Sequence, residues 1–244
     1  MQKTASEGSA LARELVGLLS AGRPCEVAVC PPFTALESVG KALAGSGVHL
    51  GSQDVHPEQQ GAFTGSISGP MLAAAGCRFA IVGHSERRHG LGEDDALVAR
   101  KLRAARRDGL VPIVCVGELL AEREAGRTTE VLVRQVAVAY EGLTLDEAVS
   151  TVIAYEPVWA IGTGKVATPD QARDAHLVIR ATLERVVGAG AGAGARMAIL
   201  YGGSVNAGNA AALFAEAEVD GALVGGASLE PAGFWKIIAA AGAS

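Results

Sequence analysis

A glutamate at the end of a buried strand is the residue of this chain whose position most clearly suggests catalysis. The apolar run TVIAY (151–155) is typical of a strand buried on both faces, and Glu156 follows it directly. Pro157 ends the strand because it has no N–H for the ladder, and the glycine-containing segment after it is typical of a closing loop. This position predicts a general base in a pocket sealed from water. The alternative is a structural carboxylate paired with a basic side chain.

A histidine occupies a similar position earlier in the chain. His84 follows the short apolar run 79–82 and one glycine, and Ser85 begins a polar stretch typical of a helical turn. The positive end of a helix dipole disfavours an imidazolium ion, so we expect a neutral imidazole that polarises a carbonyl group. A lone histidine more often only satisfies loop hydrogen bonds, but the carboxyl ends of parallel strands share one rim. Glu156 on that rim favours a catalytic pair.

Two glycine pairs follow the last two apolar runs: Gly202–Gly203, with Ser204 next, and Gly225–Gly226. Glycines let backbone N–H groups approach an anion closely, and the last two loops of parallel barrels often bind phosphate. Either pair alone would indicate a tight turn, but both pairs with the Ser204 hydroxyl predict a phosphate site. The GTGK motif at 162–165 resembles a nucleotide-binding loop. It lacks the full spacing, and Val166 replaces the Ser or Thr that such a loop needs, so we reject nucleotide binding here.

Strand and helix patterns alternate along the chain and would position these residues. Thr4 and Glu7 predict a capping box at the first helix. The basic run at 100–107 is interpreted as a solvated helix face, and Gly188–Ala195 as a flexible surface connection. Seven apolar runs are predicted strands: Glu26–Cys30, Val48–Ser52, Phe79–Val82, Val111–Val116, Thr151–Tyr155, Met197–Tyr201 and Gly221–Val224.

Repeated β-α units predict a parallel α/β fold, and 244 residues with 49% hydrophobic content suffice for one core. We predict a single barrel domain over residues 1–244. Barrels of this kind usually have eight strands, and this chain begins with a helical pattern. We therefore expect the first strand to be missing from this chain.

The composition narrows the functional classes. A net charge of −5 and an aromatic content of 4% argue against a nucleic-acid partner. No apolar run is long enough for a membrane span, and the N-terminus lacks a signal core. The four cysteines show neither zinc nor redox spacing and are interpreted as buried free thiols. We expect a cytoplasmic protein with neither nucleic-acid nor membrane partners.

These motifs together resemble the triosephosphate isomerase family over nearly the whole chain. The resemblance implies an α/β (β/α)8 TIM barrel and the family's known reaction, which requires no cofactor and no metal. That reaction interconverts D-glyceraldehyde 3-phosphate and dihydroxyacetone phosphate through an enediolate, in glycolysis and gluconeogenesis. The matching blocks are 61–65, 83–88, 154–165, 201–206 and 223–228.

The resemblance also implies a role for each matched residue. Glu156 corresponds to the base that moves a proton between two substrate carbons, and His84 to the neutral group that polarises the carbonyl. Glu86 corresponds to an acid near the site, and Cys115 to a packing residue behind it. The implied substrate-binding residues, all phosphate donors, are Gly162 in the lid, Ser204, Gly225 and Gly226.

Two positions depart from the family pattern. The family's first strand ends in a motif like Asn-Trp-Lys-Met, whose Asn and Lys contact substrate, and Met1 takes the place of that Met. We expect the strand to lie upstream of a start set at an internal Met. Ser66 replaces a Glu in the loop Gly61–Ser68, through which the family forms homodimers. A homodimer remains the expectation.

Three functions stay open at this point. The first is a triosephosphate isomerase, favoured because His84 and Glu156 are both present. The second is a catalytically impaired phosphate-binding barrel with an interaction role. The third is another phosphosugar barrel enzyme, which would need different acids and bases on the rim.

Overall fold

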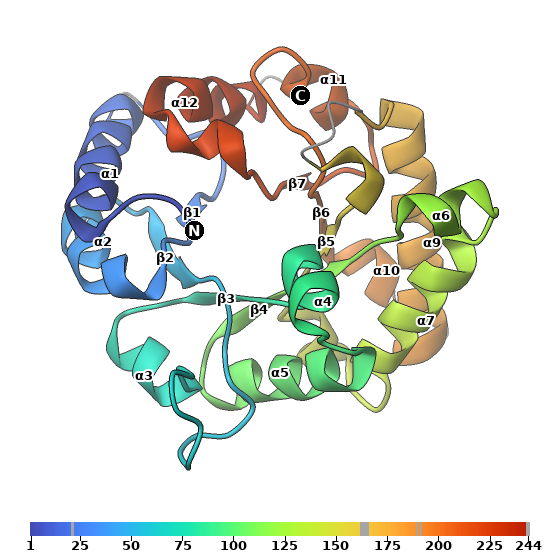
Figure 1. The fold of residues 1–244 in the computed structure, drawn as a ribbon. Coiled ribbons are helices and arrows are strands. Elements are labelled where there is room, and N and C mark those ends of the chain that lie inside the picture. Colours follow the sequence, from blue (N-terminus) through green and yellow to red (C-terminus); the bar gives the residue numbers. More distant parts are fainter. Residues whose placement is uncertain (21, 162–165, 189, 191, 243–244) are drawn as a thin grey trace.

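The chain folds into a curled parallel sheet with helices on its outside (Figure 1). The computed structural model describes residues 1–20, 22–161, 166–188, 190 and 192–242. All seven predicted runs form strands, each at or within its predicted bounds, and they are ordered β1 to β7 across the sheet. The strands are β1 (Ala28–Val29), β2 (His49–Ser52), β3 (Phe79–Val82), β4 (Val111–Val116), β5 (Val152–Tyr155), β6 (Ala198–Tyr201) and β7 (Gly221–Ala222).

Helices follow the strands, as the alternating pattern predicts. The capping box at the first helix is confirmed, since the Thr4 hydroxyl accepts from the Glu7 N–H and Glu7 accepts from the Thr4 N–H. No helix within the described ranges combines the length and apolar character that a membrane crossing needs. The helices are α1 (Ala5–Leu19), α2 (Leu36–Leu43), α3 (Gly69–Ala74), α4 (Ser85–Leu91), α5 (Asp95–Arg107), α6 (Leu120–Glu124), α7 (Thr128–Tyr140), α8 (Leu145–Val149), α9 (Pro169–Val187), α10 (Ala193–Arg196), α11 (Ala210–Phe214) and α12 (Pro231–Ala240).

The strand register brings the carboxyl ends of the strands to one rim. Tyr155 at the end of β5 pairs with Val116 of β4 and with Tyr201 of β6. Among the described residues, β1 and β7 each pair with one neighbouring strand only. Side chains that point into the barrel form a small apolar core of Phe79, Ile81, Ile113, Cys115 and Ala154.

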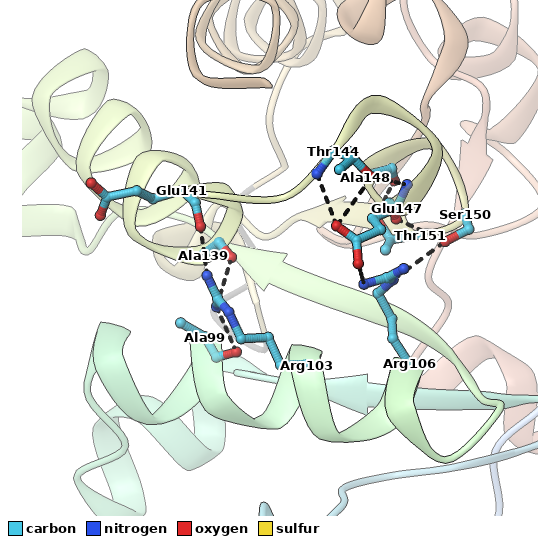
Figure 2. Close-up of polar contacts among 10 residues, drawn as sticks. All are labelled: Ala99, Arg103, Arg106, Ala139, Glu141, Thr144, Glu147, Ala148, Ser150 and Thr151. Atoms are coloured by element: carbon cyan, nitrogen blue, oxygen red, sulfur yellow. Dashed lines mark hydrogen bonds and ion pairs between the residues drawn. The ribbon is translucent and has the colours of Figure 1, made fainter. Parts of the chain in front are cut away.

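Two arginines of α5 form polar contacts with the neighbouring helices α7 and α8 (Figure 2). Arg103 donates to the carbonyl oxygens of Ala139 (3.4 Å) and Glu141 (2.6 Å) at the end of α7. Arg106 forms an ion pair with Glu147 of α8, 3.0 Å away. Cationic donors at a helix C-terminus satisfy carbonyl groups that the helix leaves unpaired. These arginines therefore hold the outer layer together.

A lysine in the same basic run lies inside the protein. Lys101 is 3% exposed, and its Nζ lies 2.6 Å from both Asp54 Oδ1 and Glu93 Oε1. Burial raises the pKa of Asp54, although Lys101 opposes this rise. The interpretation of residues 100–107 as a solvated face is wrong for this lysine, because two buried carboxylates compensate its charge.

The Gly–Ala run after α9 is organised around one carboxylate. Glu184 accepts hydrogen bonds from the N–H groups of Gly190 (2.8 Å), Gly192 (3.1 Å) and Gly194 (3.3 Å). The short helix α10 then begins within the run. The segment predicted as a flexible surface connection therefore contains hydrogen bonds to Glu184 and the start of a helix. The glycine and alanine composition alone did not predict either.

Candidate active site

Glu156 lies at the carboxyl-terminal rim of the barrel, as predicted, with 2% of its surface exposed. Its backbone extends β5, because its N–H donates to the carbonyl oxygen of Val116 (2.7 Å). Its Oε1 lies 3.0 Å from His84 Nε2, and its Oε2 accepts from the Ser85 N–H (2.8 Å). The structure therefore joins the two predicted catalytic residues directly.

His84 is the N-cap residue of α4. Its Nδ1 accepts from the Glu86 N–H (3.3 Å), so this nitrogen is unprotonated and Nε2 carries the proton that faces Glu156. Burial disfavours the imidazolium form, but the hydrogen bond and the charge of Glu156 outweigh it and raise the pKa of His84. The helix start therefore sets the tautomer, whereas Glu156 opposes the predicted neutrality for as long as it stays in contact.

Two glycines leave room for Glu156, and the sequence did not reveal this role. A Cβ on Gly117 would overlap the backbone carbonyl of Glu156. A Cβ on Gly202 would lie 2.9 Å from Glu156 Cγ and 3.1 Å from the Tyr155 carbonyl oxygen. Carbon atoms in contact are normally about 3.5–4.0 Å apart. Glycine is therefore needed directly after β4 and after β6, so that Glu156 can occupy its position at the end of β5.

The segment after Glu156 is anchored by a second buried carboxylate. Glu118 is fully buried and accepts from Trp159 Nε1 (2.8 Å), from the Tyr155 hydroxyl (3.2 Å) and from Arg123 (3.2 Å). The Arg123 guanidinium also lies over the Trp159 ring, 4.4 Å from its centroid. These contacts fix the residues from which the predicted lid begins.

Three of the predicted phosphate donors, Ser204, Gly225 and Gly226, follow the neighbouring strands β6 and β7. Asn209 donates to the Ser204 carbonyl oxygen (2.9 Å), and Ser228 donates to the Gly225 carbonyl oxygen through both its N–H (2.9 Å) and its hydroxyl (2.7 Å). In the described part of the chain, the N–H groups of Ser204, Gly225 and Gly226 have no acceptor.

Three further predictions concern Gly162, Cys115 and the absence of a metal. Gly162 lies outside the described residues. Cys115 is fully buried; burial, with a smaller contribution from the nearby Glu156, raises the pKa of its thiol. Within the described ranges, no group of three or more His, Cys, Asp or Glu side chains is arranged to hold a metal ion. The absence of a cofactor stays a prediction.

The fold and this site define a class: a parallel α/β barrel with a carboxylate and an imidazole paired on its carboxyl-terminal rim. Parallel barrels of this kind carry their active sites on that rim.

Comparison with known proteins specifies the family. The family model described as triosephosphate isomerase matches residues 1–241. The chain is 50% identical over 238 residues to the triosephosphate isomerase of Chloroflexus aurantiacus, covering 98% of this chain and 94% of that protein. It is 53% identical over 228 residues to the enzyme of Moorella thermoacetica, covering 93% and 89%.

A solved structure agrees with the sequence matches. The crystal structure of triosephosphate isomerase from Bartonella henselae superposes with a TM-score of 0.87 at 37% identity, covering 98% of this chain and 94% of that one. The chain belongs to the triosephosphate isomerase family, and its fold is the TIM barrel.

Proposed function

We propose that this protein is a triosephosphate isomerase that interconverts D-glyceraldehyde 3-phosphate and dihydroxyacetone phosphate. The observation that carries the proposal is the buried Glu156 carboxylate, held by His84 Nε2 at 3.0 Å and by the Ser85 N–H at 2.8 Å. A carboxylate and an imidazole at one rim supply the two proton-transfer groups that an aldose–ketose isomerisation needs. Family membership specifies the substrate.

Glu156 acts as the base in this proposal. It takes a proton from one substrate carbon to form an enediolate and returns a proton to the adjacent carbon. Two contacts from the start of α4 anchor its carboxylate, and turning toward substrate breaks both of them.

His84 polarises the substrate carbonyl through its Nε2–H. When Glu156 turns away, the contact that raises the pKa of His84 is lost. The Glu86 N–H still donates to Nδ1, and the helix start disfavours an imidazolium ion. Together these effects leave a neutral donor that faces the substrate oxygen.

Ser204, Gly225 and Gly226 bind the substrate phosphate with backbone N–H groups, Ser204 also donates from its hydroxyl, and Gly162 adds a donor from the lid. Exposed N–H groups beside glycines form an anion site without any cationic side chain. Lid closure excludes water and protects the enediolate from losing phosphate. Glu118 holds the base of that lid through Trp159.

The functional protein in this proposal is a cytoplasmic homodimer that uses the loop Gly61–Ser68. This loop, between β2 and α3, projects from the barrel (Figure 1). Phe63 of this loop is 44% exposed, and its ring packs against His56 with a centroid distance of 4.1 Å and an interplanar angle of 38°. An ordered, exposed aromatic side chain is typical of an interface anchor.

Turnover of D-glyceraldehyde 3-phosphate, coupled to reduction of the ketose product, tests the proposal. The wild-type chain should turn over this substrate, and His84→Gln should lose at least about 10²-fold in kcat because a general acid–base group is removed. Binding of a phosphorylated enediolate analogue without turnover would instead indicate an impaired phosphate-binding barrel. Turnover of only a different phosphosugar would indicate another barrel enzyme.

A further inference from the structure

Arg88 of α4 ties together the ends of two neighbouring strands. Its side chain is 7% exposed. Its Nε donates to the Gly83 carbonyl oxygen (2.8 Å), and its Nη2 donates to the Cys115 carbonyl oxygen (3.1 Å). Its Nη1 contacts Asp95 Oδ1 at 2.7 Å. One guanidinium therefore joins β3 and β4 to the helix that follows β3.

The two carbonyl groups need this partner because the strands separate here. The β3–β4 register ends at Val82 and Val114, and the chain turns away at Gly83, whose φ is +69°. The pairing with β3 does not reach the next residue of β4, Cys115, and its carbonyl oxygen accepts from Arg88 instead. A buried carbonyl group without a donor is costly, and Arg88 supplies the donor from within α4.

The start of α4 builds the catalytic pair. The Ser85 N–H holds Glu156, and the Glu86 N–H sets the tautomer of His84. Both N–H groups lie within the first turn of a seven-residue helix. A small displacement of this helix would therefore move both catalytic side chains.

The structure assigns Arg88 as a positioning residue for the proposed isomerisation: by binding the carbonyl groups of Gly83 and Cys115, it fixes the helix start that holds Glu156 and sets the tautomer of His84. This assignment rests on the proposed function. Arg88 acts through other residues and does not touch the reacting atoms.

The geometry requires arginine and not merely a positive charge. A planar guanidinium presents several N–H donors in fixed directions, whereas an ammonium group is a point charge on a flexible stem. Asp95 neutralises Arg88 through its Oδ1 atom. The other oxygen, Oδ2, lies 3.0 Å from Arg134 Nε. The Arg134 side chain is 51% exposed, so this outer pair offers a control that leaves the three contacts of Arg88 in place.

Arg88→Lys and Arg134→Gln form the matched test. Arg88→Lys keeps the charge beside Asp95 but cannot bridge both carbonyl groups. Its kcat should fall at least about tenfold, since a misplacement approaching 1 Å costs about 10²-fold. Its KM should change less than about threefold, because the phosphate donors lie on β6 and β7. Arg134→Gln should stay within about twofold of wild type.

The ¹⁵N spectrum of His84 supplies a readout that a general loss of stability would not move. At alkaline pH, wild type should show an unprotonated Nδ1 and a protonated Nε2, and folded Arg88→Lys should show mixed tautomers. This spectrum needs no substrate, so it tests the positioning role even if the isomerase assay fails. Asp95→Asn provides a milder second variant, which should shift the spectrum in the same direction.

Two results would overturn the assignment. One is a folded Arg88→Lys protein with wild-type kcat and an unchanged His84 spectrum. The other is a loss of kcat in Arg134→Gln as large as that in Arg88→Lys, which would mean that Asp95, rather than the bridged carbonyl groups, carries the effect.

Discussion

Gly202→Ala tests how closely the barrel is built around Glu156, the proposed base. The added Cβ would lie 2.9 Å from Glu156 Cγ and 3.1 Å from the Tyr155 carbonyl oxygen. Normal carbon contacts begin at about 3.5 Å, so Glu156 must move by roughly 0.6 Å. A 1 Å misplacement costs about 10²-fold in rate, so we expect kcat to fall roughly tenfold to hundredfold. This corresponds to about 1.4–2.7 kcal/mol of barrier.

The assay is steady-state isomerisation of D-glyceraldehyde 3-phosphate, with Gly17→Ala as the matched control. Gly17 lies inside α1, and a Cβ there would meet nothing within 4 Å. This control should keep wild-type kcat and gain up to about 1 kcal/mol of stability, because alanine favours helix. A wild-type kcat in folded Gly202→Ala, or a change in KM alone, would refute the argument from close contact.

Three further predictions concern stability, assembly and phosphate binding. Burial lowers the pKa of His176 to about 4, below its ordinary value of 6.5. As pH falls, the histidine therefore gains a proton in the unfolded state before it does so in the folded state. The free energy of unfolding falls between about pH 6.5 and pH 4 as a result. Wild type should lose about 3 kcal/mol more than His176→Asn across this window in chemical denaturation, and parallel pH curves would contradict this. Phe63→Ser should shift the protein toward monomer in analytical ultracentrifugation, and an unchanged dimer would exclude the loop as its anchor. Ser204→Ala should raise KM several-fold through its lost hydroxyl donor, and an unchanged KM would remove that hydroxyl from the phosphate site.

The strands and the meeting of Glu156 with His84 could be predicted because each follows from local sequence. A short apolar run that ends in a polar residue specifies both a buried strand and the group at its mouth. Glu156 and His84 each follow such a run, and parallel strands bring their ends to one rim. The capping box at Thr4 and Glu7 is likewise encoded within a few residues.

The features that sequence reasoning missed depend on contacts between distant segments. Gly117 and Gly202 are ordinary turn glycines until Glu156 is placed between their strands. Lys101 belongs to a basic run, and only the fold brings Asp54 against it. The pKa of His84 depends on a carboxylate far away in the sequence, so helix position alone could not predict it.

Deuterium exchange in D₂O tests the role of Glu156 most directly. Wild type should convert D-glyceraldehyde 3-phosphate to dihydroxyacetone phosphate that carries solvent deuterium, because the proton passes through an exchangeable carboxylic acid. Glu156→Gln keeps the size of the side chain and should lose both exchange and isomerisation by at least about 10²-fold. Isomerisation by wild type without deuterium uptake, or wild-type exchange in Glu156→Gln, would contradict proton transfer by Glu156.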